Sequence, residues 1–480
     1  MTIEQLNLLT MMQQSRSLLI LPLVFIAACS GGGQKAEKEN APAKFTGAKG
    51  EVKLMILDPG HFHAALVQKT MYDQVDSTVY VYAPEGPDVQ AHLAQIEGFN
   101  SRPENPTSWV NMVYTGDDCL QKMLSAKPGN VLVLAGNNAK KISYIKGAAD
   151  SGINIFADKP MAINSDGFAV LEEAFKSAEK NGVLLYDIMT ERYEITSIVQ
   201  RELSGITEVF GTLKDGSLDE PAITKESVHH FSKLVAGQPI LRPAWFFDTE
   251  QQGEGIVDVT THLVDLIQWE AFPEQSLQKS DVEMLQAKHW QTEISPEQFK
   301  KVTRLDNYPD FLQKDVVNGK LQVYSNGEML YKLKGKYAKV SVIWNFEAPA
   351  GTGDTHYSVM HGTISDLIIR QGKEENYKPT VYVQFTGNED MTNFEAALKK
   401  AVEQDMASIY PELKLVKIKD NMWTVEIPDQ YKVGHEAHFG QVMERYLQYL
   451  VKGKLPDWEV PNMITKYYTT TRALEMAKKQ

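Results

Sequence analysis

Between residues 52 and 188, short apolar runs alternate with longer segments of helical character, and this alternation constrains the fold more than any other feature. The apolar runs are rich in Val, Ile and Leu and occupy residues 52–57, 78–82, 131–135, 153–157 and 183–188. Helices are expected to start within 64–71 and to cover 141–151 and 167–181. Continuous apolar strands between helices are typical of a parallel sheet covered on both faces. The sequence therefore predicts an α/β domain, a doubly wound parallel sheet, over residues 51–190.

After residue 190 the pattern changes to an alternation of apolar and polar residues. Residues 321–333 alternate on both sides of Asn326-Gly327, a dipeptide that favours a two-residue hairpin turn. Further strands are expected at residues 340–346, 381–385, 413–418 and 422–427, the last two paired through residues 419–421. An amphipathic helix follows over residues 439–450. Alternation indicates a sheet with one covered face, so residues 191–480 are predicted to form an α+β domain with an open antiparallel sheet.

The N-terminus has the features of a secretory leader. Residues 18–28 form an unbroken apolar stretch behind Arg16, which as a helix rises about 16 Å and is too short for a hydrocarbon core of about 30 Å. It fits the apolar core of a signal peptide. The segment Ile26-Ala27-Ala28-Cys29 resembles a bacterial lipobox, which implies cleavage before Cys29 and its lipidation. The alternative is a buried strand that ends in a cysteine.

This N-terminal pattern predicts where the mature chain is found. Residues 1–28 would be removed, and the Gly- and Lys-rich residues 29–50 would form a flexible tether. The expected location is the bacterial cell envelope, in the periplasm or at the outer membrane, with the lipid as the membrane contact. A formal charge of −13 argues against a nucleic-acid partner. Two cysteines cannot build a disulfide framework.

The first predicted strand leads into Asp58-Pro59-Gly60-His61-Phe62-His63, where a dinucleotide-binding fold has its glycine-rich turn. Of the three glycines of that motif, only Gly60 is present. The turn is open to three interpretations: a degenerate dinucleotide turn, a purely structural turn, or a metal site. In the metal interpretation His61 and His63 project to the same side, and the other ligands would come from Lys159, His229, His230 and His262.

Two more predicted strands end in polar residues. One leads into Ala135-Gly136-Asn137-Asn138 and the other into Asp158-Lys159-Pro160. Open α/β sheets bind ligands at the carboxyl ends of their strands. A lysine at this edge can hold a hydroxyl oxygen or share a proton with it. The alternative for Asp158-Lys159 is a loop ion pair of little energetic weight.

The segment from Gly253 to Asp265 carries the third group of polar residues. If it is helical, Asp258, His262 and Asp265 lie on one face, at spacings of four and three residues. A histidine with a pKa of about 6.5 is a natural proton acceptor, and a carboxylate one turn away can orient it. The alternative is a histidine whose hydrogen bonds are satisfied within the core.

In this order the motifs resemble the Gfo/Idh/MocA oxidoreductases, named for glucose–fructose oxidoreductase and inositol dehydrogenase. Asp158-Lys159-Pro160 stands for the family's Glu-Lys-Pro signature, and Arg192-Tyr193 follows the last strand of the first domain. The segment from Trp245 to Asp265 matches the family's Gly-x-Gly-x-x-Asp-x-x-x-His-x-x-Asp pattern. The resemblance runs from residue 51 to the end of the chain. It implies an N-terminal Rossmann domain and a C-terminal sheet that lines the substrate pocket and mediates a homo-oligomer.

The resemblance also implies roles for individual residues. Lys159, Asp258 and His262 would be catalytic: His262 takes the proton of a sugar or polyol hydroxyl, Lys159 polarises that hydroxyl, and Asp258 orients them. No metal ion takes part. Contacts to the cofactor are implied for Gly60, His61, Phe62, Ala135, Asn137, Asn138, Asp158 and Lys159. Contacts to the substrate are implied for Arg192, Tyr193, Trp245 and Asp265.

The implied cofactor is NAD. No Lys or Arg lies between Val79 and His92, which argues against a site for the 2′-phosphate of NADP. Outside the cytoplasm an enzyme of this kind would have to retain its cofactor, which suits chemistry without net oxidation. The prediction is oxidoreduction of a sugar, glycoside or polyol. The alternatives are glycoside cleavage through a transient keto intermediate, a non-catalytic carbohydrate-binding lipoprotein, and a metal-dependent hydrolase that uses His61 and His63.

Overall fold

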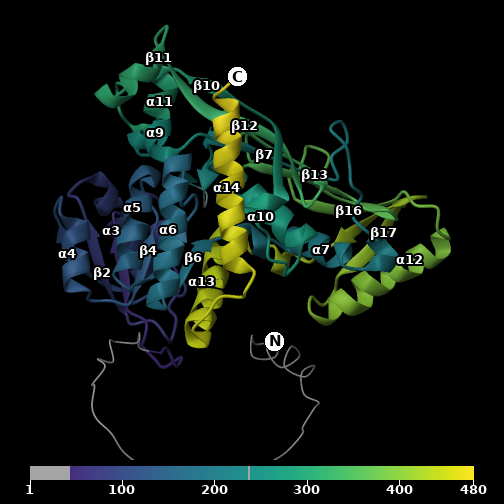
Figure 1. The fold of residues 1–480 in the computed structure, drawn as a ribbon, viewed down its shortest axis with the longest axis horizontal. Helices are drawn as coiled ribbons and strands as arrows, with labels where there is room; N and C mark the ends of the chain where they lie inside the picture. Colours follow the sequence, from purple (N-terminus) through teal and green to yellow (C-terminus); the bar gives the residue numbers. More distant parts are fainter. Residues whose placement is uncertain (1–43, 236–237) are drawn as a thin grey trace, which may run out of the picture.

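The computed structural model describes residues 44–235 and 238–480, and its first unit is the predicted doubly wound sheet (Figure 1). Six parallel strands follow the order β3-β2-β1-β4-β5-β6, which is the Rossmann order. They are β1 (Leu54–Leu57), β2 (Thr78–Ala83), β3 (Val110–Thr115), β4 (Val131–Leu134), β5 (Asn154–Asp158) and β6 (Leu185–Ile188). The predicted signal peptide and Cys29 lie outside the described residues.

The helices of this unit differ in length from the prediction at one important place. The first, α2 (His63–Leu66), is a single turn, whereas the sequence suggested a helix within residues 64–71. The others are α3 (Pro87–Ser101), α4 (Cys119–Ala126), α5 (Asn138–Asp150) and α6 (Ser165–Asn181). Helix α6 shows why these helices begin and end where they do, because Asn164 caps its first turn and Gly182 ends it with a left-handed φ of 64°.

The second unit is built on a mixed sheet, and β7 and β13 are its one parallel pair among the residues that the structure describes. Its order is β10-β12-β13-β7-β14-β15-β16-β18-β17, and β11 pairs with β12. The strands are β7 (Ile223–Ser232), β10 (Val282–Ile294), β11 (Val316–Val317), β12 (Lys320–Leu333), β13 (Lys336–Glu347), β14 (Thr355–His361), β15 (Ser365–Arg370), β16 (Thr380–Phe385), β17 (Lys414–Lys419) and β18 (Met422–Glu426). The predicted pairing of the last two is confirmed. A separate two-stranded ribbon joins β8 (Leu234–Val235) and β9 (Gln238–Pro239).

The predicted hairpin at Asn326-Gly327 is wrong, because β12 runs through both residues without turning. A Cβ on Gly327 would lie 2.6 Å from Cβ of Ile256, so the glycine permits a close approach between the strand and the segment before α10 (Thr260–Ala271). Asn326 is held in the sheet by side-chain hydrogen bonds to the backbones of Trp290 and Trp344. The chain turns instead at Lys334 and Gly335, which both have positive φ.

Two C-terminal helices return to the first unit. Helices α13 (His435–Lys452) and α14 (Glu459–Ala477) lie between the two sheets in Figure 1. The predicted apolar stripe of α13 is confirmed, but Phe439, Val442 and Tyr446 pack into the core of the first sheet. Helix α13 therefore follows residue 190 in the sequence but packs with the first unit, so the two units are not two continuous stretches of chain. The first turn of α13 lies at the edge of the first sheet.

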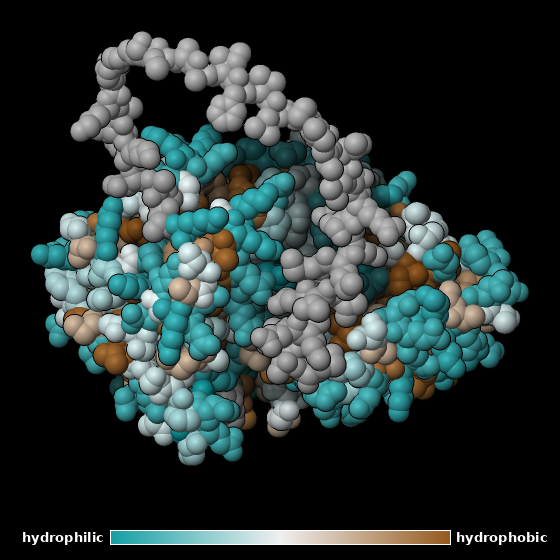
Figure 2. Space-filling model, turned by 90° about the horizontal axis from the view of Figure 1, so that it is seen from below, coloured by the Kyte–Doolittle hydropathy of each residue, from teal (hydrophilic) through white to brown (hydrophobic). Residues whose placement is uncertain are grey.

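The remaining helical segments connect these layers. Longer helices of the second unit are α7 (Ile195–Ser204), α10 (Thr260–Ala271), α11 (Pro296–Thr303) and α12 (Met391–Lys400). Short turns are η1 (Thr190–Tyr193), α8 (Thr207–Phe210), η2 (Ala244–Phe247), α9 (Thr249–Gln252), η3 (Lys279–Asp281), η4 (Asp310–Asp315), η5 (Ala401–Asp405), η6 (Met406–Ser408) and η7 (Asp429–Tyr431). Among the helices of the described residues, none has the length and hydropathy to cross a membrane. On the face shown in Figure 2, hydrophilic residues predominate and apolar ones are scattered in small groups.

Candidate functional site

A cavity of about 830 Å³ lies between the carboxyl edge of the first sheet and the second sheet. Its walls come from the residues that follow β1, from the end of β5, from α10, and from strands β7, β13 and β14. The first turn of α13, with His435 and Glu436, forms part of the remaining wall. The cavity is therefore at the strand ends where open α/β sheets bind ligands.

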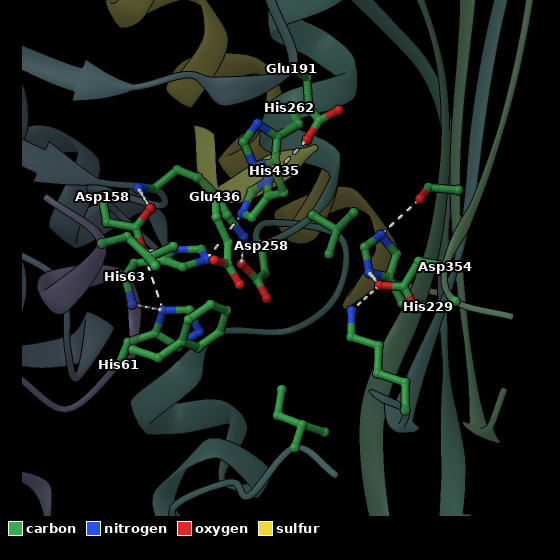
Figure 3. A pocket seen from close by; sticks show the side chains of 18 of the residues that line it. His61, His63, Asp158, Glu191, His229, Asp258, His262, Asp354, His435 and Glu436 are labelled. Atoms are coloured by element: carbon green, nitrogen blue, oxygen red, sulfur yellow. Dashed lines mark hydrogen bonds and ion pairs between the residues drawn. The ribbon is translucent and has the colours of Figure 1, made fainter. Parts of the chain in front are cut away.

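The structure brings Lys159, Asp258 and His262 together in the lining of this cavity. Figure 3 shows Asp258 and His262. Lys159 Nζ lies 2.5 Å from Asp258 Oδ1, and Gln252 donates to Asp258 Oδ2 at 3.0 Å. Burial raises the pKa of Asp258, but the ammonium group of Lys159 outweighs it and the net pKa is lowered. Asp258 precedes α10 by two residues, so the predicted single helical face of Asp258, His262 and Asp265 is wrong.

His262 is neutral in this cavity. Burial and the positive charge of Lys159 lower its pKa to about 3, against the unperturbed value expected from the sequence. Its Nδ1 atom is buried and has no hydrogen-bond partner among the described residues. The carboxylate of Glu191 has the opposite effect on the ring and favours the protonated form. The imidazole can therefore accept a proton from a bound hydroxyl, with Glu191 placed to stabilise the resulting cation.

Two predicted substrate contacts lie elsewhere. Arg192 forms a bidentate pair with Asp265 at 2.7 Å for each bond, and it also donates to Glu459. Lys466 contacts Asp265 at 2.8 Å. All four side chains are buried, and neither Arg192 nor Asp265 lines the cavity. Asp265 is occupied by Arg192 of η1 and Lys466 of α14, so this network holds η1, α10 and α14 together and the prediction of substrate contact fails.

The other two predicted substrate contacts also differ from expectation. Tyr193 is half-buried and packs against the core of the first unit. Trp245 lies on the glycine turn: its indole Nε1 donates to Asp88 at 2.9 Å, and a Cβ on Gly60 would be 3.1 Å from its ring. Trp245 therefore belongs to the region predicted for the cofactor and not to the substrate wall.

Some of the predicted cofactor residues line the cavity and others do not. The lining residues are His61, Phe62, Asn138, Asp158 and Lys159, and the others are Gly60, Ala135 and Asn137. The amides of Asn137 and Asn138 donate to Gln251 and Gln252 of α9, which ties the first sheet to the second unit. Asn137 also caps α5 through its side-chain oxygen.

The turn itself departs from a pyrophosphate cradle. The N–H groups of Gly60 and His61 both donate to the carbonyl of Ala135 at 3.2 Å, so they are not free for a phosphate. Asp58 adopts a positive φ of 48° where the motif has its first glycine, and its carboxylate accepts from Tyr144 and Lys140. The carboxylate of Asp88 lies over Gly60 beside Trp245. A pyrophosphate at Gly60 would therefore meet the carboxylate of Asp88 and the ring of Trp245.

The histidines of the cavity form two separate groups (Figure 3). His61 and His63 lie with Asp158, whose Oδ2 atom is 2.9 Å from Nδ1 of His63. His229 lies on the opposite wall, with Nδ1 2.9 Å from Asp354. The prediction that Lys159, His229, His230 and His262 complete a metal site with His61 and His63 is therefore wrong, because His229 and His230 both pair with Asp354.

Several residues of the site were not found from the sequence. Glu191 is the third residue after β6, in η1, so its position close to a strand end was a usable signal. His435 and Asp354 gave no local signal, since they come from segments far along the chain that return to the cavity. Nε2 of His229 lies 2.7 Å from Oγ of Ser227, and Nδ1 of the same ring contacts Asp354. The three side chains therefore form a connected Ser–His–Asp series on the cavity wall that β7 provides.

Comparisons with known proteins define the family. The model of a family described as "Putative oxidoreductase C terminal domain" matches residues 199–478, more than half of the chain. A solved structure of a putative oxidoreductase from Parabacteroides merdae is 60% identical, with a TM-score of 0.89, and the match covers 91% of this chain and 100% of that one. The chain therefore belongs to this oxidoreductase family. No curated protein matches the sequence.

More distant solved structures share the fold. Levoglucosan dehydrogenase in complex with NADH is 12% identical, with a TM-score of 0.57, over 89% of this chain and 97% of that one. GenD2 from gentamicin A biosynthesis, in complex with NAD, is 14% identical, with a TM-score of 0.53, over 91% and 97%. These likenesses confirm the predicted fold class, a Rossmann-like parallel sheet followed by a unit with a second sheet.

Proposed function

We propose that the chain is an NAD-linked oxidoreductase that acts on a hydroxyl group of a sugar, glycoside or polyol. The observation that carries this proposal is the grouping of Lys159, Asp258 and His262 at the carboxyl edge of a Rossmann sheet, facing a cavity that a monosaccharide can enter. Membership of an oxidoreductase family supports it. The solved complexes of levoglucosan dehydrogenase with levoglucosan and with L-sorbose show that this fold accommodates sugars and related compounds.

The residues of the cavity have separate roles in the oxidation of a hydroxyl group. The ammonium group of Lys159 donates to the substrate oxygen, and Asp258 fixes the position of Lys159 through their 2.5 Å contact. His262 enters the reaction neutral and receives the hydroxyl proton at a ring nitrogen, and the negative charge of Glu191 stabilises the protonated ring. NAD, when bound, accepts the hydride.

Nicotinamide binding tests this proposal directly. We expect purified chain either to release a nicotinamide nucleotide on denaturation or to bind NAD in calorimetry. Trp245→Ala should bind NAD at least as tightly as the unchanged chain, because the indole no longer covers Gly60. If neither protein contains or binds NAD, the proposed function is wrong. A panel of sugars and polyols, followed by the absorbance of NADH, then identifies the substrate.

One observation favours a second candidate function, cleavage of a glycoside through a keto intermediate. A second acid–base group, His229 with Asp354, lies on the wall opposite His262. Oxidation of a hydroxyl to a ketone acidifies the neighbouring C–H bond. A base can then remove that proton while the group on the next carbon leaves with a proton, after which water adds and the hydride returns. Aglycone released without net NADH supports this function, and His229→Gln should stop release but preserve NADH formation.

The expected location remains part of the proposal. A chain lipidated at Cys29 and tethered through residues 29–50 would hold this cavity at the surface of an envelope membrane. The chain would then have to retain its nucleotide, because free NAD is not expected to be abundant outside the cytoplasm. A retained nucleotide suits redox-neutral chemistry, which does not consume a free NAD pool.

A further inference from the structure

The cluster of His61, His63 and Asp158 has a geometry that hydride transfer does not require. His61 and His63 follow β1, and Asp158 is the last residue of β5, which is separated from β1 by β4. One ligand atom of each side chain lies within 4.8 Å of the others. Figure 3 shows the two rings and the carboxylate gathered on one wall of the cavity.

The two imidazoles converge on a single carboxylate oxygen. Nδ1 of His63 lies 2.9 Å from Asp158 Oδ2, and Nδ1 of His61 lies 3.7 Å from the same atom. The first distance is that of a hydrogen bond, but the second is too long for one. The backbone N–H of His63 also donates to Nδ1 of His61, at 3.4 Å. This contact and the hydrogen bond to Asp158 hold both Nδ1 atoms toward one carboxylate oxygen, so an ion can lie between the three groups.

The chemistry of the three groups suits metal binding. Metal ions are bound by neutral imidazole and by deprotonated carboxylate. The cluster offers two imidazoles and one carboxylate at one place on the cavity wall.

The residues around the cluster contact His63 and Asp158, and some of them favour a bound ion whereas others oppose it. Nε2 of His63 faces Nε2 of His435 at 3.3 Å, and Nδ1 of His435 lies 3.6 Å from Glu191. Metal-bound histidines are usually oriented by such a contact at their second nitrogen. Two cations oppose an ion here: Lys159 is paired with Asp258, and Lys141 donates to the Asp158 carbonyl at 2.9 Å.

We propose that His61, His63 and Asp158 bind a divalent transition-metal ion of the zinc class, with an open coordination position that faces the cavity. Two nitrogens and one carboxylate are the donor set of catalytic zinc sites and of other open transition-metal sites. Calcium and magnesium prefer oxygen ligands. Three protein ligands leave room for a water molecule or an oxygen of a hydroxyl- or carboxylate-bearing substrate. This site goes beyond the proposed function and does not depend on NAD binding.

Metal titration of the purified full chain tests the proposal. After treatment with a chelator, the chain should bind one Co²⁺ or Zn²⁺, measured by calorimetry and by the visible spectrum of bound Co²⁺. His61→Ala, His63→Gln and Asp158→Asn should each weaken binding by tenfold or more. His356→Gln removes a cavity histidine from β14, outside the cluster, and should leave binding unchanged.

Thermal unfolding separates metal binding from a structural ion pair. Zinc should raise the Tm of the unchanged chain and of His356→Gln, but not that of Asp158→Asn. The proposal is overturned if the unchanged chain binds no stoichiometric metal, or if the three cluster variants bind it as tightly as the unchanged chain. Either outcome leaves the nicotinamide test intact, because that test measures a different ligand.

Discussion

Lys159 and Asp258, 99 positions apart in the sequence, form an ion pair of 2.5 Å between the loop after β5 and the turn before α10. Both side chains are largely buried, at 11% and 8% exposure. The pair therefore connects the two units of the chain at the wall of the cavity. It also fixes the ammonium group that the proposed function places on the substrate oxygen.

Replacement of Lys159 by methionine tests this role. The variant keeps the length of the side chain but removes the charge that polarises the hydroxyl, so we expect the rate of NADH formation to fall by about 10²-fold or more. Lys140→Met is the matched control, because Lys140 is a half-exposed lysine of α5 that pairs with Asp58. A rate that is unchanged in Lys159→Met, at equal NAD binding, contradicts the catalytic assignment.

The low pKa of His262 predicts a pH dependence of stability. The unfolded chain binds a proton on this residue near pH 6.5, whereas the folded chain does so only near pH 3. Between these values the unfolded state holds more protons, so the free energy of unfolding falls as the pH is lowered, by up to about 1.4 kcal/mol per pH unit for this residue.

Unfolding in urea at several pH values between 3 and 7 measures this effect. His262→Gln should give a shallower loss of stability over that range than the unchanged chain. His92 is buried with a pKa of about 4 and contributes to the same window, so the slope should decrease without vanishing. Equal slopes in the variant and the unchanged chain would show that His262 is not shielded from protons in the folded state.

The network of Arg192, Asp265, Glu459 and Lys466 is expected to act on stability and not on substrate binding. Arg192→Met leaves Glu459 without its cationic partner in a buried position, and removing one member of a buried ion pair costs about 3–5 kcal/mol. Urea unfolding measures the loss, with Arg445→Met, an exposed arginine of α13, as the control. The folded variant should keep the KM of the unchanged chain. A raised KM without a loss of stability would restore the predicted substrate role of Arg192.

The first unit could be predicted from the sequence because its central strands are buried on both faces. Strand β3 was missed, since it is an edge strand whose Val110 and Met112 are 54% and 55% exposed and whose sequence carries polar residues. The short α2 could not be foreseen either. Helix α13 packs against it with Phe439 from the other end of the sequence, and no local pattern reports such a contact.

The candidate site likewise has residues that could be predicted from the sequence and residues that could not. Lys159, Asp258 and His262 could be named because their motifs are local and ordered along the chain. The choice between cavity and core could not be made for Asp265, because its spacing from His262 does not reveal that it pairs with Arg192, 73 positions away. Lys466, which contacts Asp265, lies 201 positions away. Asp158 was assigned to the cofactor, but its approach to His63 depends on the register between β1, β4 and β5.

The predicted lipid anchor is tested by labelling in cells. A chain processed at Cys29 should incorporate a radioactive or clickable fatty acid and sediment with membranes. Cys29→Ser should lose the label and remain in its unprocessed form, because the thiol that carries the lipid is absent. Cys119→Ser is the matched control, since Cys119 is buried in the folded unit. Label in Cys29→Ser equal to that of the unchanged chain would contradict the lipobox assignment.

Gly327 explains why β12 does not turn at Asn326-Gly327, and its replacement tests that explanation. A Cβ at this position would lie 2.6 Å from Cβ and 3.0 Å from Cα of Ile256, and the backbone of Ile256 cannot move freely because a Cβ on the neighbouring Gly255 would already meet the carbonyl of Ser325 at 1.7 Å. Gly327→Ala should therefore destabilise the chain by about 1–3 kcal/mol. Gly98→Ala, in α3 with nothing within 4 Å, should be neutral or stabilising. Urea unfolding distinguishes the two. Equal stability of both variants would mean that the segment before α10 does not press on β12, and that the path of the strand depends on the hydrogen bonds of Asn326 alone.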